Sequence, residues 1–259
     1  MQNHEIAGNR DTGLLKLIAA LCMIIDHAGV RLFGNMTEMR VIGRIAFPLY
    51  IWCMVVGVCH TRSTKKYALR LLLAGLISQP CYMLGLHHGW DSLSVFATLF
   101  VGYLGILAIR EKRYGSQYWG PVLALAVACV VKMDYGWRGV LLIMLMYLSR
   151  RNRGALAALM VAFCLYWGSN SYAVKSLFGL PLEGGVFDQE IVKAFLKIQA
   201  LAILALPLML WPRRERLPMP RWLGYAVYPG HLIILWIVQL LCGAVTMRES
   251  MSLLIPGLM

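Results

Sequence analysis

Several side chains of this 259-residue chain carry charge or titrate inside long apolar stretches. An ionisable group at the centre of a bilayer costs roughly 2.5–3.5 kcal/mol, so such groups persist where they face a partner or a polar cavity. Seven of them stand out: Asp26, His27, Arg44, Lys132, Asp134, Arg138 and His231. Gln79 and Gln199 are uncharged members of the same class. These residues are the candidates for a function inside a membrane.

A structural interpretation competes with the functional one. Asp26, Arg44, Asp134 and Arg138 would suit ion pairs that only fix helix packing. Near the membrane surface, Lys132 and Arg138 suit long side chains that reach out to the interface. The adjacent Asp26 and His27 favour function more strongly, because apolar residues would pack at lower cost.

The spacing of Lys16 and His27 indicates a shared role. Eleven residues of α-helix turn through about 1100°, so the two side chains differ by only about 20° and lie ~16.5 Å apart along the axis. A long anionic molecule would touch Lys16 with its phosphates and place its reactive end near His27. Asp26 lies ~100° around the helix, so the group that orients His27 is expected on another helix.

Composition defines the elements that must position these residues. Apolar residues make up 59% of the chain and charged residues 14%, against about 45–50% and 25% in soluble domains. We therefore expect an all-α, polytopic integral membrane protein of one domain, 1–259. Run lengths predict about nine transmembrane helices, within a range of eight to ten. The segments are 14–34, 40–60, 66–86, 92–110, 118–133, 136–149, 154–170, 191–211 and 222–243.

Charges between these segments predict their direction. Alternate loops carry fourteen basic residues: Arg62, Lys65, Lys66 and Arg70; Arg110, Lys112 and Arg113; Arg150, Arg151 and Arg153; Arg213, Arg214, Arg216 and Arg221. The loop from His87 to Asp91 has none. Since cytoplasmic loops are rich in Lys and Arg, the N-terminus is predicted in the cytoplasm, and the polar residues form a layer from the midplane to the outer surface. The net charge of +13 has the same origin, so nucleic acid is not an expected partner.

Familiar soluble-enzyme motifs are missing from the sequence. It contains no GxSxG, HExxH, P-loop or strand-flanked GxGxxG. Its seven cysteines lie in apolar runs without a CxxC pair, which disfavours zinc or a disulfide framework. His87, His88 and Asp91 are a weak candidate for metal, and we expect none.

The motifs together resemble the TraX family of membrane acetyltransferases. The resemblance runs from about Leu14 to Trp236 through LKLIAALCMIIDHAGV, GRIAFP, HTR, SQP, VVKMDYGWRG, KIQALAILALPLML and YPGHL. It implies N-acetylation of a pilin subunit at its N-terminus. It is also similar in outline to larger acyltransferases that use acyl-CoA and carry a basic residue and a histidine at the spacing of Lys16 and His27.

The chemistry of acyl transfer suggests a role for each of the candidate residues. His27 is expected as general base and Arg44 as the group that stabilises the oxyanion, with Asp26 pairing with Arg44 or a neighbouring donor. His231 is either a second proton carrier or a positioning group. Acetyl-CoA, or another acyl-CoA, is the expected co-substrate, and its phosphates would bind Lys16, Arg62, Lys65 and Lys66. The acceptor is expected to bind Gln79, Asp134 and Tyr135.

Other functions and acceptors stay open. The acceptor is a pilin N-terminus, an envelope glycan or another small molecule with an amine or hydroxyl. A secondary transporter or channel would use the same polar layer as a permeation path. A structural or assembly protein without catalysis is the third class. In each case the chain is expected in the inner membrane as a multi-pass protein surrounded by lipid.

Overall fold

The computed structural model describes residues 6–213, 217–220 and 222–255, and most of them are helical. Two short strands, β1 (Ser176–Leu177) and β2 (Leu180–Pro181), pair antiparallel in a hairpin. By length and composition, four segments are suited to cross a membrane: Thr12–Arg31, Thr37–His60, Thr64–Leu86 and Leu223–Leu241. The protein is therefore a helical membrane protein, as its composition predicts. The full count of nine spans stays a prediction.

The chain divides into two compact units. The first comprises residues 1–57 and 148–218, and the second comprises residues 58–147 and 219–259. The expectation of a single domain stays a prediction. Arg214, Arg216 and Arg221, three of the basic residues used to predict direction, lie outside the described residues.

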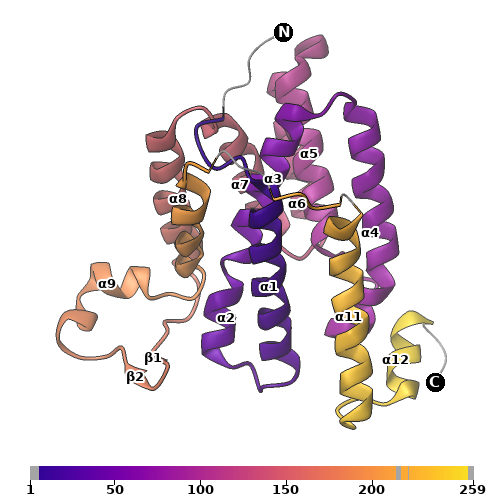
Figure 1. The fold of residues 1–259 in the computed structure, drawn as a ribbon, viewed down its shortest axis with the longest axis vertical. Coiled ribbons are helices and arrows are strands. Elements are labelled where there is room, and N and C mark those ends of the chain that lie inside the picture. The colour runs from indigo at the N-terminus through magenta and orange to yellow at the C-terminus, as the bar shows by residue number, and fades with distance from the viewer. Residues whose placement is uncertain (1–5, 214–216, 221, 256–259) are drawn as a thin grey trace. The chain divides into compact units, whose positions relative to one another are not determined.

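The first unit is built around a pair of helices near the N-terminus. Its helices are α1 (Thr12–Arg31), α2 (Thr37–Gly43), α3 (Ala46–His60) as far as Gly57, α8 (Arg153–Gly168), η2 (Gly185–Asp188), α9 (Glu190–Phe195), η3 (Ala200–Ala205) and α10 (Leu206–Leu210). Asp11 caps α1 by accepting a hydrogen bond from the Leu14 amide at 3.0 Å. Helices α1 and α2 lie side by side (Figure 1).

Helix α1 has two different faces. Ala19, Cys22 and Asp26 are buried, whereas Leu17 and Leu21 are exposed. Leucines exposed on a largely apolar helix suit contact with lipid. The buried face therefore carries Asp26 towards the protein interior.

The second predicted span is interrupted where the functional candidates lie. Arg44 and Ile45 form a turn between α2 and α3. Pro48 follows in the first turn of α3, and it has no amide hydrogen to donate to the carbonyl of Arg44 four residues earlier. The turn is a consequence of this missing backbone bond, and it places Arg44 at the C-terminal end of α2.

The predicted span 191–211 is not one continuous helix. Helix α9 ends at Phe195, and the next residues pair with another segment: Val174 donates to the Leu196 carbonyl at 2.9 Å and Ile198 donates to the Tyr172 carbonyl at 3.0 Å. The chain then continues as η3 and α10. Backbone pairing with a distant segment replaces the helical bonds here, so the apolar run alone did not reveal the break.

The second unit contains the remaining helices. They are α4 (Thr64–Leu86), α5 (Val95–Glu111), η1 (Arg113–Gly115), α6 (Ser116–Val130), α7 (Gly136–Ser149) as far as Tyr147, α11 (Leu223–Leu241) and α12 (Met247–Leu254). Helix α4 packs against both α5 and α11. Each of these helices overlaps a predicted span, with two exceptions. Helix η1 lies between the predicted spans 92–110 and 118–133, and α12 follows the predicted span 222–243.

Candidate functional site

Asp26 and Arg44 form a buried ion pair between α1 and the end of α2. Nη2 of Arg44 lies 3.0 Å from both carboxylate oxygens of Asp26. The side chains are only 10% and 8% exposed. The pairing expected for Asp26 is therefore present, and it uses a charge from the neighbouring helix.

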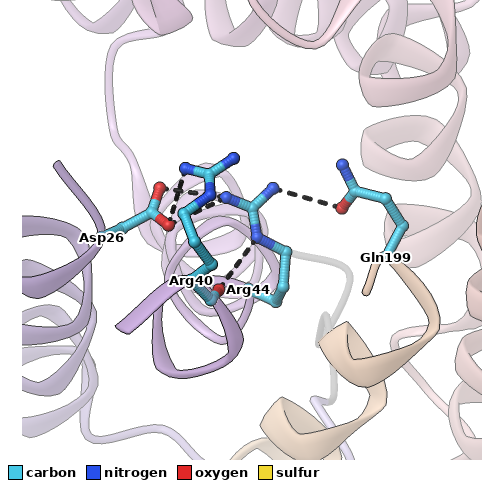
Figure 2. A network of polar contacts seen from close by, with 4 residues as sticks. All are labelled: Asp26, Arg40, Arg44 and Gln199. Carbon is cyan, nitrogen blue, oxygen red and sulfur yellow. Dashed lines mark hydrogen bonds and ion pairs between the residues drawn. The ribbon is translucent and has the colours of Figure 1, made fainter. Parts of the chain in front are cut away.

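Arg40 and Gln199 complete a four-residue network (Figure 2). Nη1 of Arg40 donates to Oδ1 of Asp26 at 2.9 Å. Nε of Arg44 donates to the backbone carbonyl of Arg40 at 3.2 Å, one helical turn earlier. Nη1 of Arg44 donates to Oε1 of Gln199 at 3.3 Å. One carboxylate thus serves two guanidinium groups.

The close approach of α1 and α2 depends on glycine. A Cβ added to Gly43 would lie 2.3 Å from Cβ, Cγ and Oδ1 of Asp26. A Cβ added to Gly29 would lie 2.7 Å from Cβ of Met39. Small residues at such contacts let helix backbones approach closely in membranes. Gly43 therefore makes room for the carboxylate that Arg40 and Arg44 share.

Lys16 and His27 lie on the same continuous helix, α1, as their spacing requires. Both are half-buried. At ~100° per residue they lie at the boundary between the buried face of Asp26 and the exposed face of Leu17 and Leu21. Asp26 itself points to Arg40 and Arg44 (Figure 2).

His231 lies in the second unit, on α11. It is buried, and its Nδ1 lies 2.9 Å from the Val227 carbonyl. A carbonyl only accepts, so Nδ1 carries the proton in the neutral ring and Nε2 keeps its lone pair. The ring also packs edge-on against Tyr228, with 5.6 Å between centroids. The backbone of its own helix therefore holds the His231 ring through Nδ1.

The residues expected to bind an acceptor hold a loop of the second unit. Nε2 of Gln79 donates to the Ser92 carbonyl at 2.9 Å, and Oε1 accepts from the Ser94 amide at 2.9 Å. The Asp134 amide donates to the Leu93 carbonyl at 3.0 Å. The Tyr135 amide donates to Oγ1 of Thr98 at 3.5 Å. These contacts bring Gln79, Asp134 and Tyr135 to one segment, residues 92–98, and their role towards an acceptor stays a prediction.

An exposed ion pair lies beside this segment. Nζ of Lys132 donates to Oδ2 of Asp91 at 2.5 Å and holds the pKa of that carboxyl below its usual value. Both side chains are largely exposed, and pairs of that kind stabilise proteins little. Within residues 6–213, 217–220 and 222–255, no group of three or more His, Cys, Asp or Glu side chains is placed to hold a metal.

The predicted phosphate ligands fall in both units. Lys16 belongs to the first unit, whereas Arg62, Lys65 and Lys66 belong to the second. All three of the latter are exposed, at or just before the start of α4, where Ser63 caps the helix. Likewise, Asp26, His27 and Arg44 belong to the first unit and His231 to the second.

Two residues of the network did not enter the predicted site. Arg40 lies four residues before Arg44, a spacing that puts both on one face of a helix. That spacing was the available signal. In the sequence Gln199 stands out only as a polar residue in an apolar stretch, and its contact with Arg44 joins residues 155 positions apart. No local pattern predicts a contact of that separation.

Comparisons with known proteins agree with the motifs. The family described as "TraX protein" matches residues 11–239. A "Probable fimbrial assembly protein FimC, serogroup H1" of Dichelobacter nodosus is 36% identical over 72 residues, which cover 26% of this chain and 30% of that protein. "Uncharacterized protein RP591" of Rickettsia prowazekii (strain Madrid E) is 26% identical over 145 residues, which cover 54% of this chain and 56% of that protein.

The chain thus spans about half or less of the length of these two relatives. No solved structure matches it significantly. The family match, in contrast, includes α1, the Asp26–Arg44 pair, Gln199 and His231. Because that match extends over most of the sequence, the chain belongs to the TraX family.

Proposed function

We propose that the protein is a membrane acyltransferase that moves an acetyl group from acetyl-CoA, or another acyl group from its CoA thioester, to an amine or hydroxyl. The observation that carries this proposal is the arginine-held Asp26 directly beside His27 on α1. A proton-accepting imidazole on α1 and a guanidinium held at the end of α2 are the groups that acyl transfer requires.

His27 is the general base of the proposed reaction. The acceptor nitrogen or oxygen attacks the thioester carbonyl carbon while His27 takes its proton, and the C–S bond then breaks. The proton passes from His27 to the departing CoA thiolate, so the base is regenerated. Arg44 stabilises the negative charge that develops on the carbonyl oxygen, and Asp26 fixes the position of Arg44.

The strip of α1 between Lys16 and His27 is the proposed path of the CoA arm. Ala20 and Met23 lie between them at offsets of four and seven residues from Lys16, and both are buried, so the arm would lie beside these two residues rather than over them. Lys16 would contact the CoA phosphates. The ~16.5 Å between Lys16 and His27 suits a molecule with phosphates at one end and a thioester at the other.

The proposal includes a direction and a location. The proposed topology has about nine spans in the inner membrane and a cytoplasmic N-terminus. Lys16 then lies on the cytoplasmic side, where acyl-CoA is made. The acceptor then arrives from the outer side. Family membership and the name of the fimbrial relative favour the N-terminus of a pilin subunit as the acceptor.

Binding of CoA is the decisive test. Purified full-length protein in detergent should bind CoA, with an affinity that falls as salt rises, because charge-assisted contacts to phosphate are screened. Lys16→Ala should weaken binding, whereas Lys175→Ala, on the exposed hairpin segment of the same unit, should not. Absence of CoA binding at any salt concentration would favour a transporter instead.

Acetyl transfer is then measured on the cell envelope. Membrane peptides and glycans from cells with and without the gene are compared by mass spectrometry. The proposal predicts an acetylated species that depends on the gene and that disappears when His27→Gln replaces the wild-type chain. The mass and site of that species identify the acceptor.

A further inference from the structure

The network of Asp26, Arg40, Arg44 and Gln199 carries more positive than negative charge. Two guanidinium groups contribute two positive charges, and Asp26 contributes one negative charge. Gln199 is neutral. An uncompensated charge inside a membrane-spanning segment is costly, and the segment Thr37–His60 is one of the four suited to span. The network therefore favours an additional negative charge.

Arg40 is the more accessible of the two guanidinium groups for that charge. Its side chain is 23% exposed, compared with 8% for Arg44. Only Nη1 of Arg40 contacts Asp26, so Nη2 takes no part in that ion pair. Its Nε is buried without a hydrogen-bond partner among the described residues. A planar guanidinium with two donors left over suits a carboxylate or phosphoryl group, which accepts two parallel hydrogen bonds.

The surrounding contacts hold Arg40 ready for such a ligand. Arg44 donates hydrogen bonds to Asp26, to the Arg40 carbonyl and to Gln199, and these bonds fix its guanidinium beside that of Arg40. The amide of Gln199 uses its oxygen on Arg44 and offers its NH₂ as a further donor. Figure 2 shows Arg40 and Gln199 on two sides of the Arg44 guanidinium. Donors outnumber acceptors throughout this cluster.

We propose that Arg40, supported by Asp26, Arg44 and Gln199, binds an anionic group of the acyl acceptor, either a carboxylate or a phosphoryl group. The assignment of this ligand to the acyl acceptor rests on the proposed function, whereas the anion site itself rests on the network alone. The donor is a poorer occupant, because Lys16 lies ten residues, or ~15 Å, along α1 from Asp26. The acceptor is therefore a molecule that carries an anionic group near its reactive amine or hydroxyl, such as a peptide with a nearby carboxylate or an anionic glycan.

The test uses simple anions on purified full-length protein in detergent. The Tm is followed by tryptophan fluorescence while chloride is replaced, at constant ionic strength, by acetate in one arm and by inorganic phosphate in the other. A ligand that binds the folded state raises the Tm by mass action, by about 3–6 °C at ten times its dissociation constant. A saturable rise in one arm identifies the carboxylate or the phosphoryl class.

Variants link the rise to Arg40. Arg40→Gln should abolish it, and Arg31→Gln, at the end of α1 in the same unit, should keep it. Gln199→Glu supplies a carboxylate from within the chain, so it should raise the Tm without added anion and abolish the response. No saturable rise in either arm, or an unchanged response in Arg40→Gln and Gln199→Glu, would overturn the proposal.

A CoA arm separates the acceptor from the donor. Arg40→Gln should leave the dissociation constant for CoA within about twofold, whereas Lys16→Ala should weaken it. An equal loss in both variants would assign the anion to the donor and overturn the assignment to the acceptor. The anion arms give their result even if the protein transfers no acetyl group, so a failure of the proposed function is distinguishable from a failure of the anion site.

Discussion

Nη2 of Arg44 lies at 3.0 Å from each carboxylate oxygen of Asp26, across the contact between two helices. A second guanidinium, that of Arg40, lies 2.9 Å from one of the same oxygens. Asp26 is therefore the only negative charge within a cluster of three charged side chains. Its removal would leave the buried Arg44 and the partly exposed Arg40 without a counter-charge in the network.

The first prediction is a large loss of stability in Asp26→Asn. Removing one partner of a buried ion pair typically costs about 3–5 kcal/mol, because the remaining charge stays buried and unpaired. For a chain of this size the Tm should fall by on the order of 10 °C. The measurement is thermal unfolding of detergent-purified protein. The double variant Asp26→Asn/Arg44→Gln should recover part of the loss, since it removes one of the two stranded cations.

The matched control is Asp91→Asn, which breaks the exposed pair with Lys132. Exposed pairs contribute little, so its Tm should stay close to that of the wild type. Equal shifts in Asp26→Asn and Asp91→Asn would mean that the Asp26 network does not stabilise the fold.

The second prediction concerns the glycine that admits Asp26. In Gly43→Ala the new Cβ would lie 2.3 Å from three atoms of Asp26, so the carboxylate must move away from Arg44. We expect a loss of about 1–3 kcal/mol, typical of overpacking, together with reduced acetyl transfer. Gly75→Ala is the control, because its Cβ would lie 3.3 Å from Cβ of Phe96 and alanine favours a helix. A tolerated Gly43→Ala with normal transfer would show that this close contact is dispensable.

The third prediction is the direction of the chain. Single cysteines at Arg113 and Arg151, both exposed, should react with a membrane-impermeant label only from the cytoplasm. A cysteine at the exposed Asp91 should react from outside. Cys129 and Cys242 are the exposed native cysteines among the described residues, so they are first replaced by serine. Reversed accessibility at two of the three positions would overturn the predicted orientation.

Local patterns were sufficient to find one side of the site. Asp26 and His27 were identifiable because charged or titratable residues are costly in an apolar run, and the same reasoning identified Arg44. The spacing of Lys16 and His27 needed only a continuous helix, which α1 is. Run length also predicts one helix in full, because the predicted span 136–149 coincides with α7.

Contacts over long sequence separations were beyond this reasoning. The segment 191–211 is as apolar as a span, yet Leu196 and Ile198 pair with Val174 and Tyr172. That pairing brings Gln199 to Arg44. The hydrophobicity of a segment predicts how it partitions between water and lipid. It does not predict with which other segment its backbone forms hydrogen bonds. The break in the segment and the role of Gln199 are therefore visible only in three dimensions.

The fourth prediction tests His27 as the general base. Glutamine can replace the hydrogen bonds of a structural histidine, but its amide does not accept a proton at neutral pH. General bases contribute typically 10²–10⁴-fold to the rate. His27→Gln should therefore retain expression, its Tm and CoA binding, and lose acetyl transfer by at least about 10²-fold.

His60→Gln, at the exposed end of α3, is the control and should transfer acetyl groups at close to the wild-type rate. A folded, CoA-binding His27→Gln protein with near-normal transfer would remove His27 from the mechanism. His231 would then be the leading candidate, because its imidazole is buried in α11 and held by the Val227 carbonyl.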